Sequence, residues 1–386
     1  MQKIKVYHFH NGSGGGVLSV IRNLLQSSNN VEIENHVIYT INKKLLKTYT
    51  INNLKGAASE TIFYYSPNWN FQYTCKQLAK LLPDDKAIII AHDWVELGMA
   101  STLGIQNKVI QFLHGDYDYY YDLAKLHGKA VDAFIAIADS IKEQLLFRMP
   151  ERIEAIHYLR FPVPDSNCKI NIEKENAVVF IGRCTNDKGF HLLPEIANCL
   201  QQQGIKLQWH IVGEVEKNVL TDFHWNADVD VHFHGSISNE KVRGLLCKSK
   251  YFILPSIAEG MPIALIESMK AGAVPLVNDL PGGIQELVFN NKTGFKIDNN
   301  NPAEFVAKLK FLILNNNSFL EMSNNCIEQS NNLFNQFVNT ELIENTIKEI
   351  SLNKSQLKRS YKVYGSKLDQ QWIPNAITSF IRSFKK

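Results

Sequence analysis

Two basic residues, Arg183 and Lys188, stand in the segment GRCTNDKG, directly after a strand-like apolar run at residues 177–181. Ligands of open α/β sheets bind beyond the carboxyl ends of strands, which is where this segment would lie. Arginine can bind phosphate oxygens bidentately, and lysine adds a compact positive charge. The segment is therefore either a phosphate-binding site or a solvated surface loop with two ordinary cations.

A glutamate pair lies in the segment EGMPIALIE, which runs from Glu259 to Glu267. Pro262 is typical of the first position of a helix, whose first backbone N–H groups have no partner within the helix. Such groups would point toward a ligand from Ile263, Ala264 and Leu265. Inside the helix, Glu267 could accept hydrogen bonds from ribose hydroxyls. In the alternative interpretation, Glu259 is a solvated loop charge and Glu267 a charge on the helix surface.

A glycine-rich segment, NGSGGG at residues 11–16, separates a strand-like run at residues 4–8 from a helical pattern at residues 16–27. Glycine permits close approach of the backbone to a ligand, and a following helix N-terminus favours an anion. The segment has neither the spacing of the dinucleotide fingerprint nor the Lys-Ser/Thr pair of a P-loop. It predicts either a diphosphate site or a merely tight turn.

Polar residues end two further strand-like runs. His92 and Asp93 follow residues 87–91, and His114 follows residues 109–113. A histidine at a strand end can hydrogen-bond a sugar hydroxyl as charge develops in a reaction, and a structural role is the alternative for these residues. Tyr117 begins the cluster YDYYY, which could stack on an acceptor sugar or stiffen its own loop by aromatic packing.

Short apolar runs alternate with helical patterns along most of the chain. Runs that are apolar on both faces predict parallel strands covered by helices. The alternation breaks at residues 159–167, LRFPVPDSN, where two prolines favour an extended linker, and then restarts. A chain of 386 residues also exceeds what one core usually supports. We therefore expect two doubly wound α/β domains.

The composition excludes several classes of protein. A net charge of +3 is too weak to indicate a nucleic-acid partner. The longest apolar runs have the length of strands, so we expect no membrane span, and the first residues lack the pattern of a secretory signal. Six cysteines without a C-x-x-C pair predict reduced thiols, which pack as small buried hydrophobes, in a cytoplasmic protein.

Taken in order, the glycine-rich segment, GRCTNDKG and EGMPIALIE resemble the motifs of the retaining glycosyltransferases of family 4. That family carries a G-R-x(4)-K-G segment and an E-x(7)-E pair. The stretches PGGIQELV at 281–288 and TGF at 293–295 are similar to its G-G-x-x-E and T-G-x stretches. The resemblance covers roughly residues 1–350. It implies a GT-B fold, in which two doubly wound parallel-sheet Rossmann-like domains face a cleft.

The resemblance implies an N-terminal acceptor domain at residues 1–165 and a C-terminal nucleotide-sugar donor domain at residues 166–369. A helix at about 370–386 would return to the N-terminal domain. Alternatively, its apolar and basic residues suit a membrane surface, which would place a cytoplasmic protein peripherally at the inner face of the membrane. Family members often have an Asn-Gly turn at the interdomain crossing, where this chain has LRFPVP.

The resemblance also implies roles for single residues. Arg183 and Lys188 would hold the donor diphosphate, and Glu267 would hold the ribose. Glu259 would face the transferred sugar, and His114 would lie near it. Further donor contacts would come from Gly15, Gly16, Met261, Ile263, Ala264 and Leu265, with Ile237 at the nucleobase. The acceptor candidates are His92, Asp93 and Tyr117.

The predicted activity is retaining transfer of a hexose to a glycan or lipid-linked acceptor in polysaccharide or glycoconjugate synthesis. The donor would be a nucleotide diphosphate sugar, with UDP-glucose as the first choice, and neither a cofactor nor a metal is expected. Asp228 and Asp230 form a D-x-D pair, but it precedes a strand and is interpreted as a solvated loop. The alternatives are a sugar-nucleotide epimerase or phosphorylase of the same fold, and an inert nucleotide-sugar-binding subunit.

Overall fold

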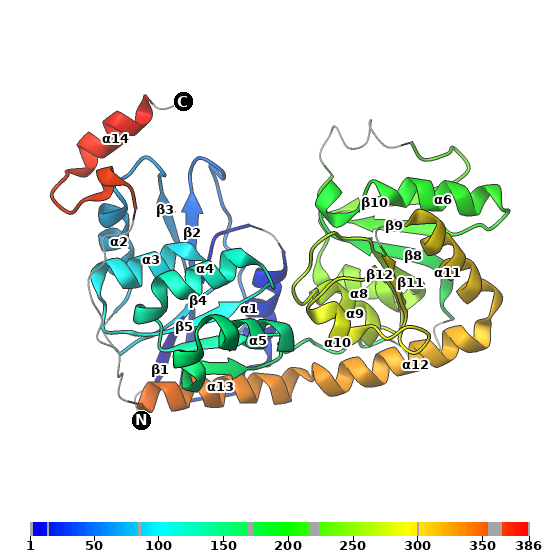
Figure 1. The fold of residues 1–386 in the computed structure, drawn as a ribbon, viewed down its shortest axis with the longest axis horizontal. Helices are drawn as coiled ribbons and strands as arrows, with labels where there is room; N and C mark the ends of the chain where they lie inside the picture. The colour runs from blue at the N-terminus through cyan, green and yellow to red at the C-terminus, as the bar shows by residue number, and fades with distance from the viewer. Residues whose placement is uncertain are drawn as a thin grey trace. The chain divides into compact units, whose positions relative to one another are not determined.

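The chain forms two compact units in the computed structural model, which describes residues 3–13, 15–83, 86–168, 173–215, 224–298, 301–353 and 365–384. Unit 1 consists of Met1–Pro162 and Phe337–Lys386, and unit 2 consists of Val163–Gln336 (Figure 1). The first crossing between units lies close to the linker expected near residue 165. The second lies at Gln336, so residues 337–369, which the sequence places in the donor domain, belong to unit 1.

Helix α13 explains the second boundary. It spans Gln336–Leu352 and follows α12, which spans Asn316–Leu333. Lys348 of α13 forms an ion pair of 2.5 Å with Glu32, and Glu344 accepts a hydrogen bond from the Ser28 hydroxyl. Asn339 Nδ2 donates to the carbonyl of Phe161 over 3.0 Å. Because each of these partners belongs to unit 1, α13 packs with that unit although it directly follows the helices of unit 2.

Unit 1 is built on a seven-stranded parallel sheet with the strand order β3-β2-β1-β4-β5-β6-β7. The strands are β1 Ile4–His10, β2 Ile33–Asn42, β3 Ser59–Tyr65, β4 Ile88–Ala91, β5 Lys108–Leu113, β6 Ala133–Ala136 and β7 Ile156–Tyr158. The helices between them are α1 Gly16–Ser27, α2 Phe71–Ala79, α3 Trp94–Leu103, α4 Asp118–His127 and α5 Asp139–Arg148. Strand order reverses between β1 and β4, which is where an open α/β sheet binds ligands.

Unit 2 repeats this plan with a six-stranded parallel sheet in the order β10-β9-β8-β11-β12-β13. The strands are β8 Glu175–Ile181, β9 Gln208–Val212, β10 Asp230–Gly235, β11 Ser249–Leu254, β12 Val274–Asn278 and β13 Phe295–Ile297. The helices that pack with them include α6 Leu192–Gln202, α8 Asn239–Lys248, α9 Ile263–Lys270, α10 Gly283–Leu287 and α11 Pro302–Leu314. Here the order reverses between β8 and β11.

The C-terminal segment ends in α14, Asn375–Ser383, and packs on the start of α2 in unit 1 (Figure 1). Asn70 fixes it, because its Nδ2 donates to the carbonyls of Leu368, Gln370 and Ile373 over 3.0 to 3.1 Å. The predicted helix at about 370–386 overlaps α14, and residues 385–386 lie outside the described residues. The segment is held by polar contacts rather than by a buried apolar face.

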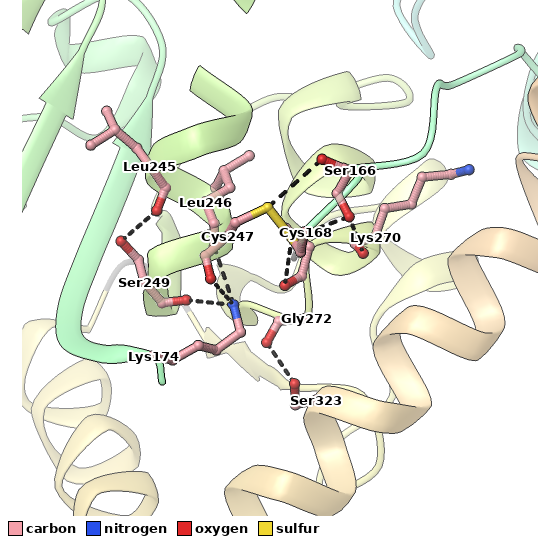
Figure 2. The surroundings of a disulfide bond; sticks show 11 residues. Ser166, Cys168, Lys174, Leu245, Leu246, Cys247, Ser249, Lys270, Gly272 and Ser323 are labelled. Carbon is pink, nitrogen blue, oxygen red and sulfur yellow. Dashed lines mark hydrogen bonds between the residues drawn. A yellow bond between two sulfur atoms is a disulfide. The ribbon is translucent and has the colours of Figure 1, made fainter. Parts of the chain in front are cut away.

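One expectation about the cysteines is wrong. Cys168 and Cys247 form a disulfide, and their Cα atoms are 5.4 Å apart (Figure 2). The two residues are 79 positions apart in sequence, so the pairing depends on the fold, which brings the segment before β8 to the end of α8. Beside the disulfide, Lys174 Nζ donates to the last carbonyls of α8, those of Leu246 and Cys247. The four free cysteines are Cys75, Cys184, Cys199 and Cys326.

Candidate functional site

The loop after β8 carries both predicted phosphate ligands of unit 2. It continues from Ile181 and turns at Gly189, which has a φ of +68°. A Cβ atom at Gly189 would lie 1.9 Å from the Pro255 carbonyl oxygen, so only glycine fits against the end of β11 there. Nearby, the Ile257 N–H donates to the Asp187 carbonyl over 3.0 Å. The loops after β8 and β11 are therefore fastened to one another at the carboxyl edge of the sheet.

This fastening brings Lys188 to Glu259. The Lys188 Nζ atom lies 2.7 Å from Glu259 Oε1, and the two side chains are 22% and 10% exposed. The family resemblance implies that Lys188 holds the donor diphosphate and that Glu259 faces the transferred sugar. A sugar diphosphate has those two groups side by side, so adjacent placement of the cation and the carboxylate suits such a ligand.

Arg183 is the more accessible cation of the loop. Its guanidinium pairs with the Asp187 carboxylate over 2.9 Å, four residues further along the chain, and its side chain is 66% exposed. Exposed ion pairs contribute little stability, about 0 to 1 kcal/mol, because solvent screens them. A phosphate can therefore replace Asp187 as the partner of the guanidinium at a small cost in free energy. Until a phosphate binds, Asp187, which was not predicted, holds Arg183 in place.

The segment after β11 leads into α9 as expected, with one shift. Pro262 is the N-cap residue, and the helix begins at Ile263. The Leu265 N–H donates to the Pro262 carbonyl over 3.1 Å, so its predicted availability to a ligand is wrong. The earlier N–H groups of the turn, those of Ile263 and Ala264, come before any helical hydrogen bond can form. The start of α9 therefore offers an anion two backbone N–H groups, those of Ile263 and Ala264, instead of the three predicted.

The stretch PGG at residues 281–283 supports this turn from behind. The Gly283 N–H donates to the Gly260 carbonyl over 2.9 Å. A Cβ atom at Gly283 would lie 2.6 Å from that carbonyl oxygen and 2.7 Å from the sulfur of Met261. Glycine is therefore required for α10 to pack this closely against the loop that carries Glu259. The resemblance included these glycines but gave them no role.

Two further donor candidates lie at the same carboxyl edge of the unit 2 sheet. Glu267 lies in α9 and is half-buried, and Ile237 follows the end of β10 and is half-buried as well. The edge thus collects two cations, three carboxylates including Asp187, and a helix N-terminus, from loops and a helix that follow strands. Such a set can bind a ligand that combines phosphate groups with hydroxyl groups.

The D-x-D pair lies at the other edge of the sheet. Asp230 is the first residue of β10, where its carboxylate pairs with His232 over 2.8 Å. Together with Glu175 and Asp228, it lines an open hollow of about 990 Å³ at the amino ends of the strands. Among the described residues that line this hollow, Lys206 is the one cation. This acidic lining would repel a diphosphate, so the hollow does not suit the donor. Among the described residues, no cluster of His, Cys, Asp or Glu is arranged to hold a metal ion.

In unit 1, three histidines meet where the strand order reverses. His10 ends β1, His92 follows β4 and His114 follows β5. His92 Nδ1 and His114 Nε2 are 2.7 Å apart and share a proton in a hydrogen bond. Burial lowers the pKa of His114 to about 3 and that of His10 to about 4, and it also lowers the pKa of His92. At neutral pH these histidines are therefore uncharged hydrogen-bonding groups. His10 was not predicted.

Asp93, an acceptor candidate, makes several contacts within unit 1. It caps α3, accepts a hydrogen bond of 2.9 Å from Asn11 Nδ2, and also accepts one from the hydroxyl of Tyr119. Tyr117, the tyrosine among the acceptor candidates, packs its ring closely over Gly115. A Cβ atom at Gly115 would lie 2.2 Å from a carbon atom of that ring. Both residues thus have clear structural functions in unit 1.

The first turn of α1 lies at the same edge of unit 1. Gly15 is the N-cap residue of α1, the helix begins at Gly16, and no side chain caps it. The expected arrangement of a glycine-rich loop before a helix is therefore present. Gly14 lies outside the described residues. The uncapped N-terminus leaves backbone N–H groups that favour an anion.

A buried acid, Glu96, underlies the histidine pair and was missed. Its Oε1 atom accepts hydrogen bonds from the N–H groups of His92 and Asp93 over 2.7 and 2.6 Å, which completes a capping box with Asp93. Burial, with a smaller contribution from the Asp93 charge, raises the pKa of Glu96 to about 8. The pattern D-x-x-E at residues 93–96 was the sequence signal that could have revealed it. Glu96 orients the backbone that presents both predicted residues.

Glu96 should make stability fall with rising pH. Its pKa in the folded protein, about 8, is above the ordinary 4.5, so its contribution is complete below pH 4.5 and is lost as the pH rises through 8. The Glu96→Gln variant keeps the acceptor oxygen but cannot ionise. We expect its melting temperature to stay level between pH 6 and about 9, while that of the wild type falls. Thermal unfolding across this range measures the difference.

The control for this prediction is Glu143→Gln, because Glu143 lies exposed on α5. It should retain the pH dependence of the wild type. Below pH 6 all three proteins should lose stability, since the lowered pKa values of His10 and His114 oppose protonation in the folded state. Parallel pH profiles for the wild type and Glu96→Gln above pH 6 would contradict the assignment.

Comparison with known proteins bears most directly on unit 2. Residues 165–333 match the family model of glycosyl transferases group 1. The putative colanic acid biosynthesis glycosyltransferase WcaL of Escherichia coli (strain K12) is 30% identical over 142 residues, 34% of this chain and 34% of that protein. The Escherichia coli UDP-Gal:alpha-D-GlcNAc-diphosphoundecaprenol alpha-1,3-galactosyltransferase is 26% identical over 189 residues, 47% of this chain and 48% of that protein. The matched regions thus span a third to a half of these relatives.

Among solved structures, the chain resembles HepE of Anabaena in complex with UDP and glucose, with a TM-score of 0.70. The two are 15% identical, and the match covers 90% of this chain and 100% of the other. At this identity the likeness concerns the fold. It confirms the predicted class, an α/β protein with two Rossmann-like parallel-sheet domains of the GT-B type. Within the described residues, no helix is long and apolar enough to cross a membrane.

Proposed function

We propose that this chain is a glycosyltransferase that moves a sugar from a nucleotide diphosphate donor to a glycan or lipid-linked acceptor in polysaccharide or glycoconjugate synthesis. The observation that carries the proposal is the ion pair of Lys188 and Glu259 at the carboxyl edge of the unit 2 sheet. Lys188 Nζ and Glu259 Oε1 are 2.7 Å apart. Both residues lie within the segment that matches the group 1 glycosyl transferase model. A cation for phosphate beside a carboxylate for sugar hydroxyls is what such a donor requires.

The donor is assigned to unit 2. Arg183 and Lys188 neutralise the diphosphate, Glu267 binds the ribose, and Ile237 contacts the base. UDP-glucose is the first candidate, because the Anabaena neighbour was solved with UDP and glucose. The N–H groups at the start of α9 add to the phosphate contacts.

The proposed reaction is a retaining transfer. The bond between the anomeric carbon and the diphosphate oxygen breaks, and the acceptor oxygen bonds to that carbon on the same face. The acceptor proton passes to the departing diphosphate, whose charge Arg183 and Lys188 stabilise. Glu259 orients the sugar through its hydroxyl groups. In unit 1, the neutral His114 hydrogen-bonds the reacting sugar, and the buried His92 orients His114 through their 2.7 Å contact.

The acceptor is assigned to unit 1, with Asp93 and Tyr117 as its nearest contacts. Nucleotide affinity should then depend on unit 2, whereas turnover should depend on residues of both units. The test of the proposal is a thermal-shift panel of nucleotide diphosphate sugars, because a ligand that binds the folded state raises its melting temperature. UDP-glucose should give the largest rise. If no nucleotide sugar raised the melting temperature, the proposal would fail.

The reaction should not need a divalent metal. Two cationic side chains meet the diphosphate charge, and the D-x-D pair lies at the opposite edge of the sheet, beside an acidic hollow. We expect UDP release from UDP-glucose in the presence of acceptor to be unchanged by excess EDTA. Complete loss of activity on chelation, with recovery on adding manganese, would instead point to Asp228 and Asp230 as ligands.

A further inference from the structure

The C-terminal helix turns its apolar face outward. Its large apolar side chains, Ile377, Phe380 and Ile381, and that of the C-cap residue Phe384 are between 39% and 71% exposed. Their spacing of i, i+3, i+4 and i+7 places them on one stripe of α14. A surface helix normally directs such a stripe toward the core. Just before the helix, Trp372 is also 79% exposed.

The polar side of α14 is the side that holds it to unit 1. The Thr378 hydroxyl is buried and donates to the Leu368 carbonyl over 2.9 Å. Arg382 pairs with the buried Asp369 over 2.6 Å and donates to the Trp69 carbonyl over 2.6 Å. Asp369 also accepts a hydrogen bond of 2.7 Å from the Phe71 N–H. These contacts fix the rotation of α14 about its axis, so the apolar stripe faces outward.

In the sequence, basic residues are concentrated in the last 33 positions of the chain. Residues 354–386 contain eight Lys and Arg against one acid, Asp369, a net charge of +7. The preceding 353 residues contain 33 Lys and Arg against 37 Asp and Glu, a net charge of −4. Because Asp369 is buried and paired with Arg382, no exposed acid accompanies the apolar stripe between residues 365 and 384. The apolar stripe is therefore flanked in sequence by an excess of basic residues, of which Lys367 and Arg382 lie in the described part of the segment.

We propose that this face docks on the surface of a lipid bilayer that contains anionic lipids. The stripe of α14 and Trp372 would enter the boundary between headgroups and acyl chains, and the basic residues would attract the lipid phosphates. With nine residues, α14 is too short to span a bilayer and would lie in its plane. A second copy of the chain fits this face less well, because a symmetric contact would bring two positive segments together.

The test uses the full-length protein and vesicles, without any sugar nucleotide, so its result is independent of the proposed activity. We expect the protein to sediment with vesicles of phosphatidylcholine and phosphatidylglycerol, and much less with phosphatidylcholine alone. Added salt should weaken the binding, because it screens the charges. The double variant Phe380→Ser/Phe384→Ser should lose about tenfold or more in vesicle affinity. Both side chains are exposed, so its melting temperature should match that of the wild type.

The matched control is Phe147→Ser, because Phe147 is 83% exposed on α5, elsewhere on unit 1. It should bind vesicles like the wild type. Equal binding by the wild type and the double variant would overturn the proposal, and so would absence of binding to anionic vesicles. A dimer in solution that the double variant abolishes would also overturn it, by showing that a second copy covers this face.

Discussion

Replacing Lys188 with methionine is expected to lower kcat about 100- to 1,000-fold, the range measured when one preorganised charge-stabilising donor is removed. Charge develops on the leaving diphosphate during transfer, and Lys188 is the better shielded of the two cations, with 22% of its side chain exposed against 66% for Arg183. A shielded charge acts more strongly than a solvated one. Steady-state kinetics with UDP-glucose and acceptor measure the loss.

A second effect of this substitution must be separated from catalysis. Without Lys188, the Glu259 carboxylate, whose side chain is 10% exposed, loses its partner and should destabilise the fold. The double variant Lys188→Met/Glu259→Gln removes that unpaired charge. It should recover melting temperature relative to Lys188→Met but should not recover kcat.

The control is Lys250→Met, because Lys250 lies at the amino end of β11 and bonds Asn176 over 3.0 Å. Its kcat should stay close to that of the wild type. If Lys188→Met kept more than about a third of the wild-type kcat, well outside the expected loss, the assignment to the leaving diphosphate would be wrong.

Replacing Glu267 with alanine should raise the Kd for UDP about 10- to 100-fold. A lost hydrogen bond to a charged group costs about 1.5 to 3 kcal/mol, and each 1.4 kcal/mol is a factor of ten. The half-buried position of Glu267 in α9 shields it from full solvent competition. Calorimetric titration with UDP measures the change, and Glu267→Gln should give a smaller one, since its amide oxygen still accepts.

Glu321→Ala serves as the control, since Glu321 lies exposed on α12. UDP affinity should be unchanged in that variant. Should Glu267→Ala bind UDP as tightly as the wild type does, Glu267 would have only a structural role and the ribose would be bound elsewhere.

Much of the fold could be read from the sequence, because parallel strands that are covered on both faces leave a local signal. Runs such as residues 177–181 are apolar at every position, and each is followed by polar loop residues and a helical pattern. The donor segments were readable for the same reason, since GRCTNDKG and EGMPIALIE each follow such a run. These runs give no information on contacts between residues that are far apart in the sequence.

The features that were missed depend on such contacts. The disulfide of Cys168 and Cys247 joins residues 79 positions apart, and no local pattern links them. The second unit boundary depends on the pairing of Lys348 with Glu32, which the helical pattern of α13 alone does not reveal. The Leu265 N–H is bonded within the protein because of where the first turn of α9 begins. Sequence patterns place the start of a helix only to within a residue or two.

Glu96 is a different case, because its signal is local. The capping box that begins at Asp93 needs only the spacing D-x-x-E, which is visible in the sequence. Glu96 supports both predicted residues, His92 and Asp93, through their backbone N–H groups. Its second oxygen, Oε2, is buried without a hydrogen-bond partner in the described structure, as suits a carboxyl group that holds its proton.

Backbone hydrogen exchange with and without UDP tests the placement of the donor site. We expect slower exchange in residues 182–189 and 257–267, which carry the proposed phosphate, sugar and ribose contacts. We expect no change in residues 226–230, at the amino edge of the same sheet. Protection at the amino edge, or no protection in the two loops at saturating UDP, would contradict the placement of the donor site.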